Sequence, residues 1–129
     1  MALEIAIDKN RYRDFMEGDQ SAVSTFRTAA RICVPFVVVA ELRAGFAVGT
    51  RGRENERNFE IFLGRSRVEV LFPAMTTTRH YANLFRQLRA AGTPIPSNDI
   101  WIAALVIEHD LYLYSRDSHF DFLPQIPRV

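Results

Sequence analysis

Residues 94–120 read PIPSNDIWIAALVIEHDLYLYSRDSHF, and this stretch decides the fold class. The apolar run at 100–107 predicts a buried helix. We expect Ser97 to be its N-cap residue, because a serine hydroxyl accepts a hydrogen bond from a free N–H of the first turn. A short strand is predicted at 111–114, followed by an acidic turn. A helix that leads directly into a strand in this way is typical of α/β proteins.

The rest of the chain continues this alternation of strands and helices. Apolar side chains at 3, 5 and 7 alternate with other residues, which is the period of a strand, and the tail after residue 120 predicts a short turn and an edge strand. An alternating order of this kind favours an α/β fold with a mainly parallel sheet, here within one domain covering residues 1–129. The predicted elements are strands at 3–7, 32–34, 68–71 and 111–114 and helices at 11–30 (broken near 18), 35–48 and 76–91, with a polar loop that begins at residue 50 and runs into an exposed helix reaching residue 63.

Composition places few limits on function. The chain has 129 residues, a net charge of +1 and fifteen arginines beside a single lysine, Lys9. One cysteine, Cys33, excludes an internal disulfide and a cysteine zinc site. The N-terminus lacks the basic and apolar regions of a secretory signal, and the apolar runs are far shorter than the roughly 20 residues of a membrane helix. We therefore expect a soluble cytoplasmic protein without a membrane partner.

Four acidic residues lie at the edges of predicted elements. Asp8 ends the first strand, Glu41 lies on an apolar helix face, Asp99 lies in the first turn of a helix, and Asp117 follows the last strand. Ligands of parallel sheets collect beyond the carboxyl ends of the strands. A carboxylate on an apolar face also needs a cation or a proton as partner. Each acid alone has an ordinary explanation as a turn former or a first-turn charge.

Taken together, the four acids predict a metal site. Carboxylates that lie close together raise one another's pKa unless a cation joins them. Mg²⁺ and Mn²⁺ prefer oxygen ligands and leave room for phosphate oxygens. No other catalytic set competes, because the three histidines are scattered along the sequence and neither a Gly-rich phosphate loop nor a nucleophile elbow is present.

Four motifs in this order resemble the PIN-domain family, and specifically the VapC-type toxin ribonucleases of type II toxin–antitoxin pairs. They are IAIDKN at 5–10, VPFVVVAELRAGFAVGT at 34–50, GTPIPSNDIWIAA at 92–104 and LYSRDSHF at 113–120. The resemblance implies a PIN-like three-layer α/β/α sandwich that uses Mg²⁺ or Mn²⁺. It implies that the catalytic and metal-binding acids are Asp8, Glu41, Asp99 and Asp117, supported by Asn10 and Ser115.

The same resemblance implies a function and partners. We expect a divalent-metal-dependent endoribonuclease that cleaves structured RNA, with transfer RNA as the expected target, and so inhibits translation. A VapB-type antitoxin and a homodimer are the expected protein partners. Large aromatic residues give weak support to such contacts, although core packing explains each of them equally: Phe46, Phe59, Phe62 and Phe85.

One departure from the family pattern leaves alternatives open. Family members usually carry Thr or Ser after the first aspartate, whereas this chain has Lys9 there. Lys9, Arg43 and Arg116 are candidates for contacts with RNA phosphate, although Lys9 can also be a surface lysine without a role and the arginines can pair with acids. A lysine at the metal position also fits a catalytically impaired PIN-like module that binds an antitoxin but no metal. A carboxylate phosphatase is a third reading, but it would need a second acid near Asp8.

Overall fold

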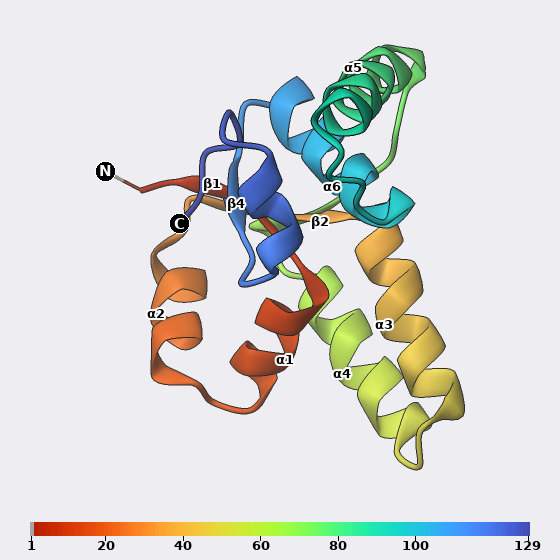
Figure 1. Cartoon of the computed structure of the whole chain (residues 1–129). Helices are drawn as coiled ribbons and strands as arrows, with labels where there is room; N and C mark the ends of the chain where they lie inside the picture. Colours follow the sequence, from red (N-terminus) through yellow and green to blue (C-terminus); the bar gives the residue numbers. More distant parts are fainter. Residues whose placement is uncertain (1) are drawn as a thin grey trace.

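The sheet of this protein is entirely parallel over residues 2–129, which are the residues that the computed structural model describes. Its strand order is β3–β2–β1–β4, so β1 lies in the interior beside β4 (Figure 1). Residues of β1 and β2 are almost completely buried, as expected for strands covered on both faces. The strands are β1 (Glu4–Ile7), β2 (Arg31–Pro35), β3 (Val68–Leu71) and β4 (Tyr112–Tyr114).

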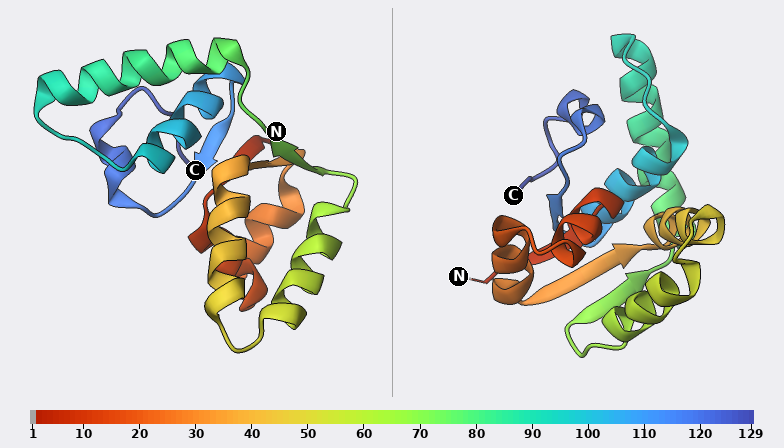
Figure 2. Two further views of the ribbon diagram at one scale, coloured as in Figure 1. Left: turned by 90° about the vertical axis from the view of Figure 1, so that its right-hand side faces the viewer. Right: turned by 90° about the horizontal axis from the view of Figure 1, so that it is seen from below.

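Helices cover both faces of the sheet and confirm the predicted three-layer sandwich. Figures 1 and 2 show α1 to α4 on one face and α5 and α6 on the other, with a short 3-10 helix, η1, near α6. No helix among residues 2–129 combines the length and hydrophobicity needed to cross a bilayer. The helices are α1 (Lys9–Met16), α2 (Gln20–Thr28), α3 (Phe36–Val48), α4 (Gly52–Leu63), α5 (Met75–Ala91), α6 (Ser97–Glu108) and η1 (Ser118–Phe122).

The prediction that Ser97 caps α6 is wrong. Pro96 is the N-cap residue, with φ −57° and ψ 147°, and it provides no side-chain cap. Ser97 is already helical, and its hydroxyl instead lies 3.0 Å from the hydroxyl of Tyr81 on α5. Two prolines hold the preceding segment extended, so the helix begins directly after the second of them.

The C-terminal tail lies beside β4 but forms no full edge strand. Its contact is a single parallel bridge between Leu113 and Arg128. The Leu113 N–H donates to the Pro127 carbonyl at 2.8 Å, and the Val129 N–H donates to the Leu113 carbonyl at 3.1 Å. Proline cannot donate to a strand ladder, which limits the pairing and corrects the predicted edge strand. The tail nevertheless returns Arg128 to the loop that follows β4.

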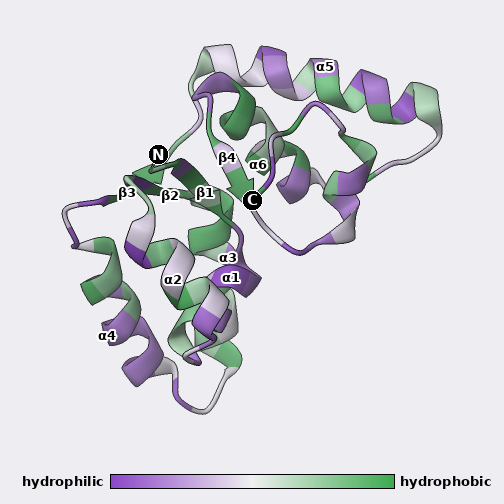
Figure 3. Ribbon diagram, turned by 90° about the vertical axis from the view of Figure 1, so that its left-hand side faces the viewer, coloured by the Kyte–Doolittle hydropathy of each residue, from purple (hydrophilic) through white to green (hydrophobic). Residues whose placement is uncertain are grey.

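Hydrophobic side chains fill the space between the layers. Figure 3 shows the sheet and α6 as predominantly hydrophobic, whereas α5 carries many hydrophilic residues. Three of the four aromatic residues that were candidates for protein contacts belong to the hydrophobic core. Phe59 and Phe62 are buried, and Phe46 is partly buried and packs against the core. Phe85 differs, because 48% of it remains exposed on α5. The core thus fixes the carboxyl ends of β1 and β4, the first turn of α6 and the interior of α3, where the four predicted acids lie.

Candidate metal centre at the carboxyl edge of the sheet

The strand order places a crevice between the carboxyl ends of β1 and β4. The chain leaves β1 into α1 on one face of the sheet and enters β4 from α6 on the other face (Figure 2). Such a change of side is a topological switch point, where parallel sheets bind their ligands. Because Ile7 pairs with Tyr114 in the ladder, the next residues, Asp8 and Ser115, lie side by side.

Asp8 is held firmly at this edge. It is only 3% exposed and is the N-cap residue of α1. One carboxylate oxygen accepts a hydrogen bond from the Lys9 N–H at 2.7 Å, and the other accepts one from the Ser115 hydroxyl at 2.8 Å. Ser115 is itself 3% exposed. The carboxylate orientation is therefore fixed by two donors from different elements, and the Ser115 contact has the geometry expected of a supporting residue.

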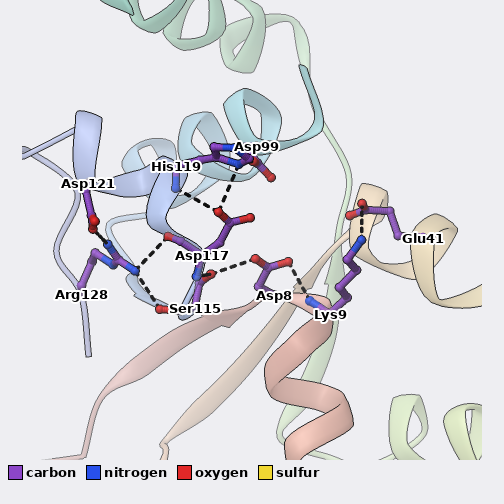
Figure 4. A network of polar contacts seen from close by, with 9 residues as sticks. All are labelled: Asp8, Lys9, Glu41, Asp99, Ser115, Asp117, His119, Asp121 and Arg128. Carbon is purple, nitrogen blue, oxygen red and sulfur yellow. Dashed lines mark hydrogen bonds and ion pairs between the residues drawn. The ribbon is translucent and has the colours of Figure 1, made fainter. Parts of the chain in front are cut away.

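Asp99, Asp117 and His119 form a compact group beside Asp8. Asp99 comes from the first turn of α6, and Asp117 ends the loop after β4. His119 Nδ1 lies 2.8 Å from Asp99 Oδ2 and 3.1 Å from Asp117 Oδ1. One ligand atom from each of the three residues lies within 4.8 Å of the others. Figure 4 shows Asp8 between this group and the pair formed by Lys9 and Glu41.

His119 is the residue that the sequence prediction missed. The three histidines are scattered along the sequence, yet His119 follows Asp117 by only two residues. The Asp117 side chain accepts a hydrogen bond from the His119 N–H at 2.9 Å and so caps η1. This local turn brings the imidazole back over both carboxylates. The signal that could have identified it is the Asp-x-His spacing in the acidic turn after the last predicted strand.

Burial makes the charge of Asp99 costly. The pKa of the Asp99 carboxyl is raised to about 6, mainly by burial and also by the nearby Asp117 and Asp8 carboxylates, while the hydrogen bond with His119 acts in the opposite direction. Asp99 is 8% exposed, so water screens this repulsion poorly. A cation in the crevice would remove the penalty.

Glu41 lies apart from the three-residue group and already has a cation. Its Oε2 lies 3.2 Å from Nζ of Lys9, and the two side chains are 24% and 36% exposed. This pairing confirms the expectation that Glu41 needs a partner cation. The apolar face on which it lies is less buried than its sequence indicates, because Val48 in the last turn of α3 is 89% exposed.

The other predicted residues lie around this centre. Arg43 pairs with Glu56 of α4 at 3.0 Å, and Arg116 forms two 3.0 Å hydrogen bonds with Asp14 of α1. Both guanidinium groups are thus engaged by acids. Asn10 is half-buried on α1, and no hydrogen bond of its side chain is found within residues 2–129.

Arg128 supports the loop that carries Asp117. Its guanidinium donates to the carbonyls of Ser115 at 2.8 Å and Asp117 at 3.3 Å, and it pairs with Asp121 at 2.6 Å (Figure 4). The loop carbonyls would otherwise have to find water as their partner. The tail residue therefore braces the loop from the side opposite the crevice.

The donor set fits a divalent ion. Asp8, Asp99 and Asp117 offer oxygen atoms, which suit Mg²⁺ and Mn²⁺. The imidazole nitrogen of His119 adds a donor that suits first-row transition ions better than Mg²⁺. Three elements contribute these side chains, so the fold positions them before any ion binds.

Comparisons with known proteins show the family to which the chain belongs. The family model described as "PIN domain" matches residues 7–124. The chain is 32% identical over 120 residues to "Ribonuclease VapC1" of Haemophilus influenzae (strain R2866), covering 87% of this chain and 84% of that protein. It is 28% identical over 93 residues to "Ribonuclease VapC4" of Mycobacterium tuberculosis, covering 72% of each.

Solved structures show the same fold. VapBC2 from Rickettsia felis, bound to a DNA fragment from its promoter, matches with a TM-score of 0.87 at 23% identity and covers 98% of both chains. VapBC-1 from nontypeable Haemophilus influenzae matches with a TM-score of 0.85 at 22% identity, covering 98% of this chain and 97% of that one.

Proposed function

Because the chain belongs to the PIN-domain family and is of the VapC type, we propose that it is the toxin of a toxin–antitoxin pair and acts as a divalent-metal-dependent endoribonuclease. Its substrate is structured RNA in the cytoplasm, with transfer RNA as the preferred class, and its cleavage inhibits translation. The observation that carries the proposal is the convergence of Asp8, Asp99 and Asp117 from three separate elements on one edge of the sheet, where Asp8 and Asp99 are buried.

The roles of the residues follow from their contacts. Asp8, Asp99 and Asp117 would hold Mg²⁺ or Mn²⁺, and Ser115 fixes the orientation of the Asp8 carboxylate through its 2.8 Å hydrogen bond. A bound divalent ion lowers the pKa of a water molecule and offsets the charge that develops at the scissile phosphate. Glu41 is placed to accept a hydrogen bond from the attacking water, since one of its oxygens is free of Lys9. Asn10, in the first turn of α1, is proposed as a further polar support.

The proposal is tested by removing and returning the metal. Purified protein incubated with total RNA in Mn²⁺ or Mg²⁺ is expected to give discrete cleavage products, because the acids lack a compensating charge without an ion. Excess EDTA should abolish cleavage, and added Mn²⁺ should restore it. Sequencing of the new RNA ends identifies the target. Cleavage that continues in EDTA and copurifies with the protein would show a metal-independent mechanism and would reject the proposal.

A second candidate function is an impaired module that binds an antitoxin but no metal. The 3.2 Å contact between Lys9 and Glu41 favours it, because an ammonium group already neutralises one of the four acids. Calorimetric titration with Mn²⁺ separates the two functions. Binding heat supports the nuclease, and its absence together with undamaged RNA supports the module.

We further propose a VapB-type antitoxin and a second copy of the chain as partners. Matching structures are VapBC complexes, which supports the first. Large apolar side chains are exposed around the link from β3 to α5, where Phe72 is 71% and Met75 is 83% exposed, and this supports a protein contact. Light scattering of the purified chain is expected to give the mass of a dimer. A monomer at micromolar concentration, with and without the antitoxin, would contradict the dimer.

A further inference from the structure

Lys9 connects the two parts of the acidic site. Its backbone N–H donates to Asp8 at 2.7 Å, and its ammonium group lies 3.2 Å from Glu41, a residue 32 positions further along the chain (Figure 4). The side chain therefore extends from the first turn of α1 across to α3. It is the only lysine of the chain, where every other basic residue is an arginine.

The acids divide into two subsites around this lysine. Asp99, Asp117 and His119 hold their ligand atoms within 4.8 Å of one another, and Asp8 lies beside them. Glu41 is absent from that group within residues 2–129 and faces Lys9 instead. One subsite thus contains acids that lack a fixed cation, whereas the other contains an acid that already has one.

We propose that the Lys9 ammonium serves as a built-in cation beside Glu41, in the place of a second metal ion, so that the site takes one divalent ion. This inference rests on the proposed function. A second divalent ion on Glu41 would have to lie within a few ångströms of the ammonium group, and like charges at that distance repel strongly in a partly buried site. Lysine carries three N–H donors, and Glu41 uses only one of them here. Because 36% of the Lys9 side chain is exposed, the ammonium group can also donate to a phosphate oxygen of the RNA.

The proposal predicts metal stoichiometry, which does not depend on activity. Mn²⁺ titration followed by electron paramagnetic resonance should give one bound ion for the wild-type protein and one for Lys9→Arg, which keeps the charge. Lys9→Thr should gain a second, weaker ion, because Glu41 is then left without a cation. The double variant Lys9→Thr/Glu41→Gln should return to one ion, which attributes the gained site to Glu41.

A second measurement uses the wild-type protein alone and so avoids any effect of substitution on folding. Labelling with ¹³C-lysine gives one side-chain ε-methylene signal, since Lys9 is the single lysine. One equivalent of Mn²⁺ should broaden that signal strongly, because a paramagnetic ion at Asp8 lies close to Lys9, whereas Mg²⁺ should leave it sharp.

The outcomes separate this inference from the proposed function. Two ions in the wild-type protein, or a single ion in Lys9→Thr, would overturn the role of Lys9 and leave the metal-dependent nuclease standing. Binding of no ion by any of the proteins would overturn both. A lysine signal that stays sharp with one equivalent of bound Mn²⁺ would also overturn the inference, because the ion would then lie away from Lys9.

Discussion

Asp99→Asn is expected to lower RNA cleavage and Mn²⁺ affinity by at least about 100-fold. Partners that only orient a metal ligand already contribute roughly 10- to 100-fold, and Asp99 offers its oxygen directly to the group with Asp117 and His119. Asparagine keeps the shape and one acceptor oxygen for His119, so the fold should persist. RNA cleavage and Mn²⁺ titration measure the loss, and circular dichroism checks the fold.

A matched control lies on the loop that follows the same helix. Asp110 is exposed just beyond the end of α6, at φ 55°, a backbone conformation that asparagine also tolerates. Asp110→Asn should therefore cleave RNA and bind Mn²⁺ like the wild-type protein. Equal cleavage by Asp99→Asn and Asp110→Asn would remove Asp99 from the metal site.

Asp99→Asn should also change how the free energy of unfolding depends on pH when no divalent ion is present. Burial raises the pKa of Asp99 to about 6, so the folded protein favours its protonated form. The stability that this proton provides is complete below the unfolded pKa of about 4 and is lost as the pH rises through about 6. Relative to the wild type, Asp99→Asn should thus gain roughly 2 kcal/mol of unfolding free energy between pH 4 and pH 7. Urea unfolding at both pH values tests this, and an unchanged difference would contradict the buried charge.

Much of the site could be predicted because it depends on where elements end. Asp8 and Asp117 follow strands, and parallel strands end at a common edge, so their proximity follows from the α/β order alone. The position of Asp99 could be predicted because it lies in the first turn of the helix that precedes β4. The prediction for Glu41 was incomplete: its apolar face required a cation, but a partner 32 residues away cannot be chosen from sequence. Only the packing of α1 against α3 identifies that partner as Lys9.

Residues that depend on local turns were harder to predict. Serine is a residue type that favours the N-cap position. Pro96 takes that position instead, so α6 begins one residue earlier than the sequence predicts. His119 reaches Asp99 because the Asp117 side chain closes a turn of η1, a contact that spacing along the sequence does not measure. In both cases one backbone conformation decides the outcome, and propensity is too weak to predict it.

Phe59→Ala is expected to lower the free energy of unfolding by roughly 3–5 kcal/mol, which is a large part of the roughly 5–15 kcal/mol of a typical domain. The Phe59 side chain is 0% exposed. The centroid of its ring lies 5.1 Å from that of Tyr12 of α1, in an edge-on contact, and 5.9 Å from that of Phe46 of α3. The cavity left by the substitution would therefore open between α1, which carries Lys9, and α3, which carries Glu41. Ile61 on the same helix is 59% exposed, and Ile61→Ala should cost under about 1 kcal/mol.

Urea unfolding of both variants measures these costs. Because Phe59 contacts neither α6 nor the loop after β4 through its ring pairs, folded Phe59→Ala should still bind one Mn²⁺ at low temperature. Its Lys9–Glu41 pair should be looser, since the packing of α1 against α3 sets that distance. The lysine ε-methylene signal should therefore move toward its position in unfolded protein before the Mn²⁺ site is lost. If Phe59→Ala and Ile61→Ala lowered the free energy of unfolding equally, the ring contacts of Phe59 with Tyr12 and Phe46 would not be what holds α1 against α3.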